Sequence, residues 1–169
     1  MASSILVRNM RGEDLEDLMR IQRSAYPPEF NESLDVFSER LQVCSATAWV
    51  AEMSEKVCAY LMGYRSQLGA ITALSDVFTP NPQGDTLYLH DLALDPFARG
   101  QKIAQQLLQQ AEKLSLAQGC HYMALVSVQN TSGFWEKQGF ASVGELSPEQ
   151  LRVLATYSGD AIYMVRPLR

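Results

Sequence analysis

The sequence is poor in the residues that build metal centres and disulfide frameworks. Its 169 residues include two histidines and three widely spaced cysteines that form no CxxC pair. An odd number of isolated cysteines argues against a disulfide framework and against a zinc site. We therefore predict no bound metal, and we expect Cys44, Cys58 and Cys120 to behave as small buried hydrophobic residues.

Excess positive charge and long apolar runs are also absent. The formal net charge is −5, and no basic stripe could neutralise nucleic-acid phosphates, so a nucleic-acid partner is not expected. This charge weakly favours a cationic small molecule as partner, although it also simply favours solubility. No segment approaches ~18 uninterrupted apolar residues, and the first residues do not resemble a signal peptide. These features predict a cytoplasmic protein with no membrane partner, built as a single domain over residues 1–169.

Two familiar phosphate-binding fingerprints are missing as well. The sequence contains no GxxxxGK[ST] segment, and no GxGxxG follows a predicted strand. P-loop and dinucleotide-binding folds therefore lose support.

Hydrophobic periodicity predicts a mixed α/β (α+β) domain without internal repeats or linkers. Strands are expected at residues 4–8, 47–53, 57–64, from 87, 122–128, from 140, and 161–165. Helices are expected from about residue 13 to 26, from a cap at Asn31 or Ser33, through the apolar stripe at 103–114, over 134–137, and from 147 to about 155. Residues 66–85 are rich in turn residues and predict a long surface loop, which in a compact domain is more often functional than not.

The segment Leu87–Ala117 is the most informative part of the chain. It reads as a strand, a tight turn with Asp95-Pro96 and Arg99-Gly100, and a long amphipathic helix. The first amides of such a helix have no helical partner, and the helix dipole is positive at this end. The segment therefore predicts an anion-binding site.

Two motifs give this segment a family resemblance. The run Leu92–Gly100 followed by a helix resembles the acetyl-CoA motif of the GNAT acetyltransferase superfamily, and Gly133–Phe140 resembles its "FYEKxGF" segment. Within the superfamily, Tyr88–Ala93 is similar to a strand of serotonin (arylalkylamine) N-acetyltransferases. The resemblance implies the GNAT acyl-CoA N-acyltransferase fold, a mixed central sheet flanked by helices. It also implies acetyl-CoA as cosubstrate, and direct attack of an amine on the thioester in a ternary complex.

The resemblance places the cosubstrate on the strand and on the turn that follows it. Backbone groups of Leu92, Ala93 and Leu94 would pair with the pantetheine arm, and a β-bulge there would aim one amide at the thioester carbonyl. The pyrophosphate would lie on Arg99, Gly100, Gln101, Lys102, Ile103, Ala104 and Gln105. Lys102 departs from the motif, which has glycine there; its ammonium could still contact phosphate. A loss of CoA binding is the alternative that this departure leaves open.

The resemblance makes His90 the candidate base that removes a proton from the substrate ammonium. Simple strand alternation places Tyr88 and Leu92 on its side of the strand, and Leu89, Asp91 and Ala93 on the other. The alternative is a half-buried histidine that only bonds to a neighbour. His121 has no comparable context and is expected at the surface.

The general acid is not assigned by the motif. Relatives have a tyrosine at the position of Trp135, whose indole N–H is no proton source near neutral pH. Trp135 is expected to pack against the pantetheine arm or the core. Tyr88 is a candidate acid on geometry alone, and the thiolate could equally take its proton from solvent.

Two further features have both a functional and a structural interpretation. Asn130 could bond to the pantetheine amides, or could simply be a turn residue. Tyr26, Glu29, Phe30 and Glu32 lie between the first two helices, where the family often builds its acceptor pocket; an aromatic residue with carboxylates would suit an amine. The alternative is a polar loop between the helices.

The acceptor stays open at this stage. An arylalkylamine, polyamine, amino acid, antibiotic amine, protein N-terminus or lysine would each fit, as would acyl chains other than acetyl. Relatives are frequently homodimers. The competing hypothesis is a catalytically degenerate CoA-binding regulatory module, in which Lys102 and Trp135 mark a lost active site.

Overall fold

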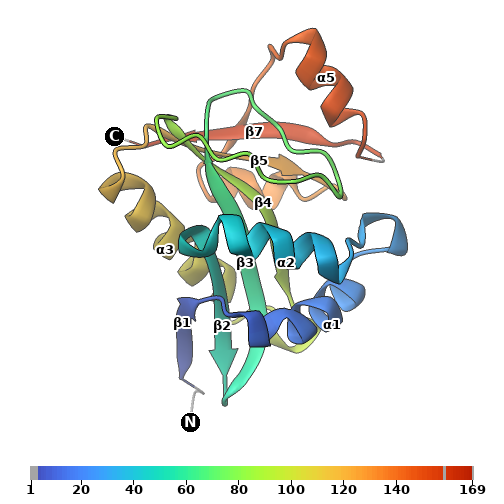
Figure 1. Cartoon of the computed structure of the whole chain (residues 1–169), viewed down its shortest axis with the longest axis vertical. Helices are drawn as coiled ribbons and strands as arrows, with labels where there is room; N and C mark the ends of the chain where they lie inside the picture. Colours follow the sequence, from blue (N-terminus) through green and yellow to red (C-terminus); the bar gives the residue numbers. More distant parts are fainter. Residues whose placement is uncertain (1–3, 158, 169) are drawn as a thin grey trace.

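The computed structural model describes residues 4–157 and 159–168, which form a seven-stranded mixed sheet with helices on both faces (Figure 1). The strands are β1 (Ile5–Asn9), β2 (Ala48–Met53), β3 (Lys56–Ser66), β4 (Thr86–Leu94), β5 (Tyr122–Ser127), β6 (Ala141–Ser142) and β7 (Ile162–Pro167), and their order in the sheet is β1-β2-β3-β4-β5-β7-β6. Only β4 and β5 pair in parallel; the other neighbours are antiparallel. The predicted mixed sheet flanked by helices is confirmed.

Five α-helices and four short 3-10 turns complete the fold of the described residues. The α-helices are α1 (Leu15–Ala25), α2 (Leu34–Val43), α3 (Ile103–Ala117), α4 (Ser132–Lys137) and α5 (Pro148–Leu154). The 3-10 turns are η1 (Gly12–Asp14), η2 (Pro28–Phe30), η3 (Ser45–Thr47) and η4 (Pro96–Ala98). None of the helices in this described part is long and apolar enough to cross a membrane.

Local sequence signals explain where several elements begin and end. The Ser33 hydroxyl accepts a hydrogen bond from the Val36 amide and caps α2, and Ser147 caps α5 in the same way. Ser54 and Glu55 take positive φ angles of 53° and 62° in the tight turn between β2 and β3. Such angles are what a two-residue hairpin turn requires, so the predicted hairpin is confirmed.

The sheet separates two hydrophobic cores. Helices α1 and α2 cover one face, in front of the sheet in Figure 1, and α3 covers the other. The stripe predicted for α3 is buried as expected, except that Leu114 is half-buried and Ser115 is fully buried. The three cysteines are buried and His121 is exposed, as predicted.

Candidate functional site

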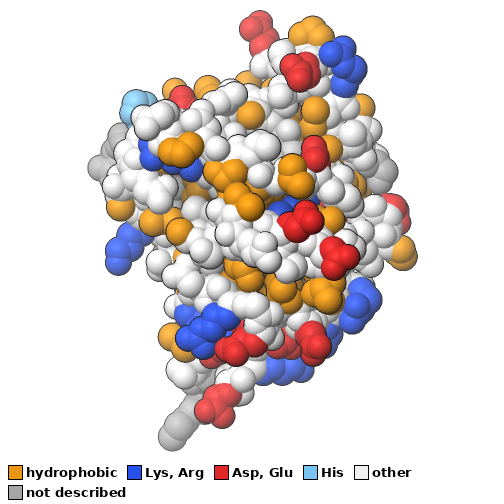
Figure 2. Space-filling model, in the orientation of Figure 1, with side chains coloured by type: hydrophobic (Ala, Val, Ile, Leu, Met, Phe, Trp, Pro, Cys, Tyr) orange, Lys and Arg blue, Asp and Glu red, His pale blue; other side chains and the backbone are white. Residues whose placement is uncertain are grey.

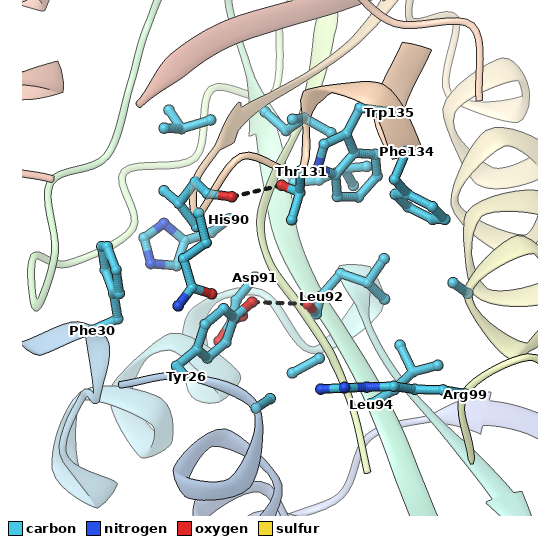
Figure 3. A pocket seen from close by; sticks show the side chains of 18 of the residues that line it. Tyr26, Phe30, His90, Asp91, Leu92, Leu94, Arg99, Thr131, Phe134 and Trp135 are labelled. Carbon is cyan, nitrogen blue, oxygen red and sulfur yellow. Dashed lines mark hydrogen bonds between the residues drawn. The ribbon is translucent and has the colours of Figure 1, made fainter. Parts of the chain in front are cut away.

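A cavity of about 590 Å³ opens where β4 and β5 separate. The two strands pair only from Thr86↔Tyr122 to Leu89↔Leu125, although β4 continues to Leu94. Beyond Leu89 the free edge of β4 therefore forms one wall of the cavity, and β5 with the loop that follows it forms the other. Figure 3 shows this open space, with Tyr26 and Asp91 on one side of it and Phe134 and Trp135 on another.

The register of β4 directs unpaired backbone groups into the cavity. The Asp95 amide donates to the Cys58 carbonyl at 2.8 Å, which extends the ladder between β3 and β4. Because hydrogen-bonded pairs alternate along antiparallel strands, Ala93 bonds to Tyr60 on β3, whereas Leu92 and Leu94 turn their amides away from β3. Those two amides face the cavity, beyond the point where β5 stops pairing with β4.

A β-bulge at His90 changes which side chains share a face. Met62 of β3 pairs with Asp91 but the next residue, Gly63, pairs with Leu89, so His90 is an extra residue in β4. The backbones approach so closely there that a Cβ on Gly63 would lie 2.2 Å from the Tyr88 carbonyl oxygen. Only glycine fits at this position.

The bulge corrects the strand alternation expected from the sequence. Tyr88 and Ala93 lie in the core under α1 and α2, whereas Leu92 and Leu94 pack toward α3. Asp91, expected on the face opposite His90, accepts hydrogen bonds from two tyrosines of the α1 and α2 core. The expectation that His90 and Leu92 share one face of β4, and Asp91 and Leu89 the other, is therefore wrong. The extra residue in β4 reverses the side to which the following side chains point.

Asp91 is the carboxylate that the sequence reasoning missed. Its Oδ2 accepts from the Tyr60 hydroxyl at 2.6 Å and its Oδ1 from the Tyr26 hydroxyl at 2.8 Å, and the residue lines the cavity. Burial, and then the negative charge of Glu32, raise the pKa of Asp91 to about 6 against the opposing hydrogen bonds. A carboxylate inside the largely apolar β4 was the signal that could have revealed it.

His90 lines the cavity, but its side chain is almost completely buried and contacts Glu32. Its side chain is 2% exposed, and its Nε2 lies 3.2 Å from Glu32 Oε1. Its Nδ1 is buried without a hydrogen-bond partner among the described residues. Glu32 also accepts two hydrogen bonds from Arg40, at 2.8 and 2.7 Å, in a pair that is almost completely buried.

The electrostatic consequence for Glu32 is a stable negative charge. Burial acts to raise the pKa of Glu32, but the hydrogen bonds and positive charge from His90 and Arg40 outweigh it and hold that pKa well below its usual range. The Ser75 amide donates a further hydrogen bond to Glu32 at 2.7 Å. Glu32 therefore remains an anion whose hydrogen-bonding capacity is largely used by the protein.

Tyr88 lies outside the cavity wall. Its side chain is buried in the core next to Tyr64 and His90, and it is not one of the cavity-lining residues. Burial raises the pKa of Tyr88 well above its usual value of 10. This position gives no support to Tyr88 as the acid that protonates a leaving thiolate.

Most other residues predicted for the site do line the cavity. These are Leu92, Ala93, Leu94, Arg99, Gly100, Lys102, Ile103, Ala104, Gln105 and Trp135 among the predicted CoA contacts, and Tyr26 and Phe30 among the predicted acceptor contacts. Figure 3 shows Arg99 extending toward the cavity from the side opposite Trp135. Gln101, Asn130 and Glu29 do not line it, and all three are exposed.

The turn before α3 has the shape that glycine favours, although a lysine occupies it. Gly100 and Lys102 have positive φ angles of 77° and 60°, and Lys102 is the N-cap of α3. The first helical hydrogen bond runs from the Gln106 amide to the Lys102 carbonyl, so the amides of 103–105 have no helical acceptor. The anion-binding geometry is thus present with lysine at this position.

We expect Lys102→Gly to stabilise the protein by about 0.5–1 kcal/mol, because a left-handed backbone is costly for a residue with a Cβ. The matched control is Lys113→Gly, at an exposed position inside α3, which is expected to cost about 1 kcal/mol. Urea denaturation of the three proteins measures both values. Equal destabilisation by the two substitutions would show that Lys102 is not strained.

Comparisons with known proteins agree with this geometry. The model of the acetyltransferase (GNAT) family matches residues 15–140. No curated protein matches the sequence.

Three similar solved structures cover nearly the whole chain. GphF, a GNAT-like decarboxylase in complex with isobutyryl-CoA, is 17% identical over 97% of this chain and 100% of that chain, with a TM-score of 0.79. Ard1 from Thermoplasma volcanium is 16% identical over 98% of each chain, with a TM-score of 0.73. PaiA N-acetyltransferase from Thermoplasma acidophilum, in complex with coenzyme A, is 20% identical over 98% of this chain and 99% of that chain, with a TM-score of 0.66. At these identities the likeness shows the fold.

Proposed function

The chain belongs to the GNAT acetyltransferase family, and from this we propose that it transfers an acetyl group from acetyl-CoA to a primary amine. The observation that carries the proposal is the continuous cavity that joins the N-terminus of α3, the free β4 edge at Leu92 and Leu94, and Asp91. One end presents amides suited to a pyrophosphate, and the other presents a carboxylate suited to an ammonium group. Similar folds that hold CoA or isobutyryl-CoA support an acyl-CoA ligand.

In the proposed reaction Asp91 accepts the proton that the substrate ammonium must lose. The neutral amine nitrogen then attacks the thioester carbonyl carbon, and a C–N bond forms while the C–S bond breaks. The Leu92 or Leu94 amide stabilises the oxyanion that develops on the carbonyl oxygen. CoA leaves as a thiolate and takes up the second proton, which the nitrogen releases to it directly or through solvent. No acyl-enzyme is formed on this route.

Asp91 suits the role of base better than His90 does. A base works best when its pKa lies near the operating pH, and the pKa of Asp91 is raised to about 6. His90 also lines the cavity, but its side chain is only 2% exposed, with Nε2 engaged by Glu32 and Nδ1 buried. We therefore assign proton transfer to Asp91 and a positioning role to His90.

The competing proposal of a catalytically degenerate CoA-binding module gains no support. Lys102 keeps the backbone conformation of the glycine that it replaces, and Trp135 lines the cavity while packing edge-to-face on Phe134 and Phe140. The similarity of residues 88–93 to arylalkylamine N-acetyltransferases remains a hypothesis about the acceptor.

Calorimetric titration with acetyl-CoA tests the ligand. We expect 1:1 binding with a dissociation constant below about 100 μM, corresponding to roughly 5–6 kcal/mol of binding free energy. Titration with isobutyryl-CoA tests the acyl chain, because one similar fold holds that thioester. The absence of binding for every thioester at high micromolar concentration would contradict the proposal.

A further inference from the structure

The acceptor end of the cavity has an apolar wall. Aromatic and aliphatic side chains line it on the sheet face that carries α1 and α2, among them Ala25, Tyr26, Phe30, Leu74, Val126 and Tyr157. The Tyr26 and Phe30 rings lie 6.4 Å apart, and Figure 3 shows both on the side of the cavity that holds Asp91. A wall of this composition favours a ligand with an apolar body.

One carboxylate at this end is left for a cationic ligand. Glu32 and Asp91 are the acidic residues that line the cavity. Glu32 is already occupied by the two Arg40 nitrogens, the Ser75 amide and His90. Among the described residues, Asp91 accepts hydrogen bonds from two neutral tyrosine hydroxyls and from no charged donor. The site can therefore neutralise one ammonium group, whereas a second would be buried unpaired, which is strongly unfavourable.

Several backbone polar groups of the segment 69–76, which carries Leu74, form hydrogen bonds within the protein. Its hydrogen bonds join Gly69 N–H to the Tyr163 hydroxyl at 2.9 Å, Ile71 N–H to Gln150 Oε1 at 2.8 Å, the Thr72 carbonyl to the Tyr157 hydroxyl at 2.6 Å, Ser75 N–H to Glu32 at 2.7 Å, and the Asp76 carbonyl to Arg40 at 2.7 Å. A peptide acceptor that added as a strand along this segment could not hydrogen-bond to these groups, because they already bond within the protein. These five hydrogen bonds also hold the segment that carries Leu74 in place on the cavity wall.

We propose that the acceptor is a primary monoamine on a compact apolar body, and that Leu74 and Phe30 set the size of that body. This inference rests on the proposed acyl transfer and narrows its acceptor. Polyamines are disfavoured by the single available carboxylate. A peptide strand is disfavoured by the backbone groups of 69–76 that already bond within the protein. Acidic side chains lie near the middle of the face shown in Figure 2, and together with the net charge of −5 they favour the approach of a cation.

The test compares four amines by the rate at which they release free thiol from saturating acetyl-CoA. Isoamylamine and phenethylamine represent aliphatic and aromatic monoamines, spermidine a polyamine, and a peptide with a free N-terminal alanine a protein acceptor. We expect at least one monoamine to exceed spermidine and the peptide at least tenfold in kcat/KM. A higher kcat/KM for spermidine or the peptide would overturn this inference and leave the acyl transfer standing. If none of the four amines caused thiol release, both this inference and the proposed acyl transfer would be overturned.

Leu74→Ala tests the residue assignment. The substitution shortens a side chain that lines the cavity and so enlarges the acceptor end. We therefore expect KM to fall for the larger phenethylamine and to rise for the smaller isoamylamine. The control is Leu68→Ala, at a 44% exposed leucine that precedes the segment and lies outside the cavity, and it is expected to leave the preference unchanged. An equal change for both amines in Leu74→Ala, or the same shift in Leu68→Ala, would show that Leu74 does not set the size.

Discussion

Asp91→Asn is expected to lower kcat/KM for the amine at least a hundredfold while making the protein more stable at pH 8. The activity falls because an amide cannot take the proton that the ammonium must lose, and a positioned base contributes about 10²–10⁴-fold. Activity of the unmodified protein should fall as the pH drops through about 6, where Asp91 becomes protonated. The activity of Asp91→Asn should not show this decrease near pH 6.

The gain in stability follows from the sign of the pKa shift. The pKa of Asp91 is raised from 3.8 in the unfolded chain to about 6 in the folded one, so the folded protein binds the proton more tightly. The stabilising effect of protonation is complete below about pH 4 and is lost as the pH rises through 6. Above pH 6 the charged carboxylate destabilises the fold by roughly 3 kcal/mol, which asparagine removes.

Thermal melts of the two proteins at pH 8 and pH 4 measure this effect. We expect Asp91→Asn to melt several degrees higher at pH 8, with a smaller difference at pH 4. The control is Asp95→Asn, because Asp95 is buried and paired with Arg20, and its loss should lower the melting temperature instead. If Asp91→Asn retained activity while His90→Gln lost it, the base would be His90 and our assignment would be wrong.

Arg40→Met is expected to destabilise the protein by about 3–5 kcal/mol. Arg40 and Glu32 have side chains that are 1% and 3% exposed, so removing the guanidinium leaves a buried carboxylate with only His90 and an amide as partners. The same change frees the Asp76 carbonyl, which accepts from Arg40, and exposes the Phe78 ring that Arg40 covers. Urea denaturation gives the free energy of unfolding.

A matched substitution separates burial from charge. Arg11 and Glu13 also form an ion pair, but their side chains are 63% and 73% exposed, so Arg11→Met should change stability by less than about 0.5 kcal/mol. Adding Glu32→Gln to Arg40→Met should recover part of the loss, because it removes the unpaired charge. Similar losses for Arg40→Met and Arg11→Met would show that the buried pair is not what holds this region together.

Much of the fold was predictable because its signals are local. The period of apolar residues predicted α3 and its buried face, Ser33 was one of two expected caps of α2, and the short polar turn at 54–56 predicted the hairpin. Each of these features depends on residues within about one or two turns of chain. The strand, turn and helix around Gly100 were likewise predictable from local residues.

The chemistry of the site was less predictable because it depends on cross-strand register. The bulge at His90 arises from the pairing of β4 with Gly63, 27 positions away, and it brings Asp91 to the face that alternation assigned to His90. The Glu32–His90 contact joins residues 58 positions apart, and the Tyr26–Asp91 contact 65. No local pattern contains these long-range contacts, so the sequence points to His90 as the base and gives no role to Asp91.

The most direct test of the account is to quantify CoA and N-acetylated amine together by mass spectrometry. The protein is incubated with acetyl-CoA and an apolar monoamine at pH 8, alongside Asp91→Asn at the same concentration. We predict that one acetylated amine appears for each CoA released, and that the Asp91→Asn rate is at least a hundredfold lower. Release of CoA without acetylated amine, or equal rates for the two proteins, would contradict acyl transfer at Asp91.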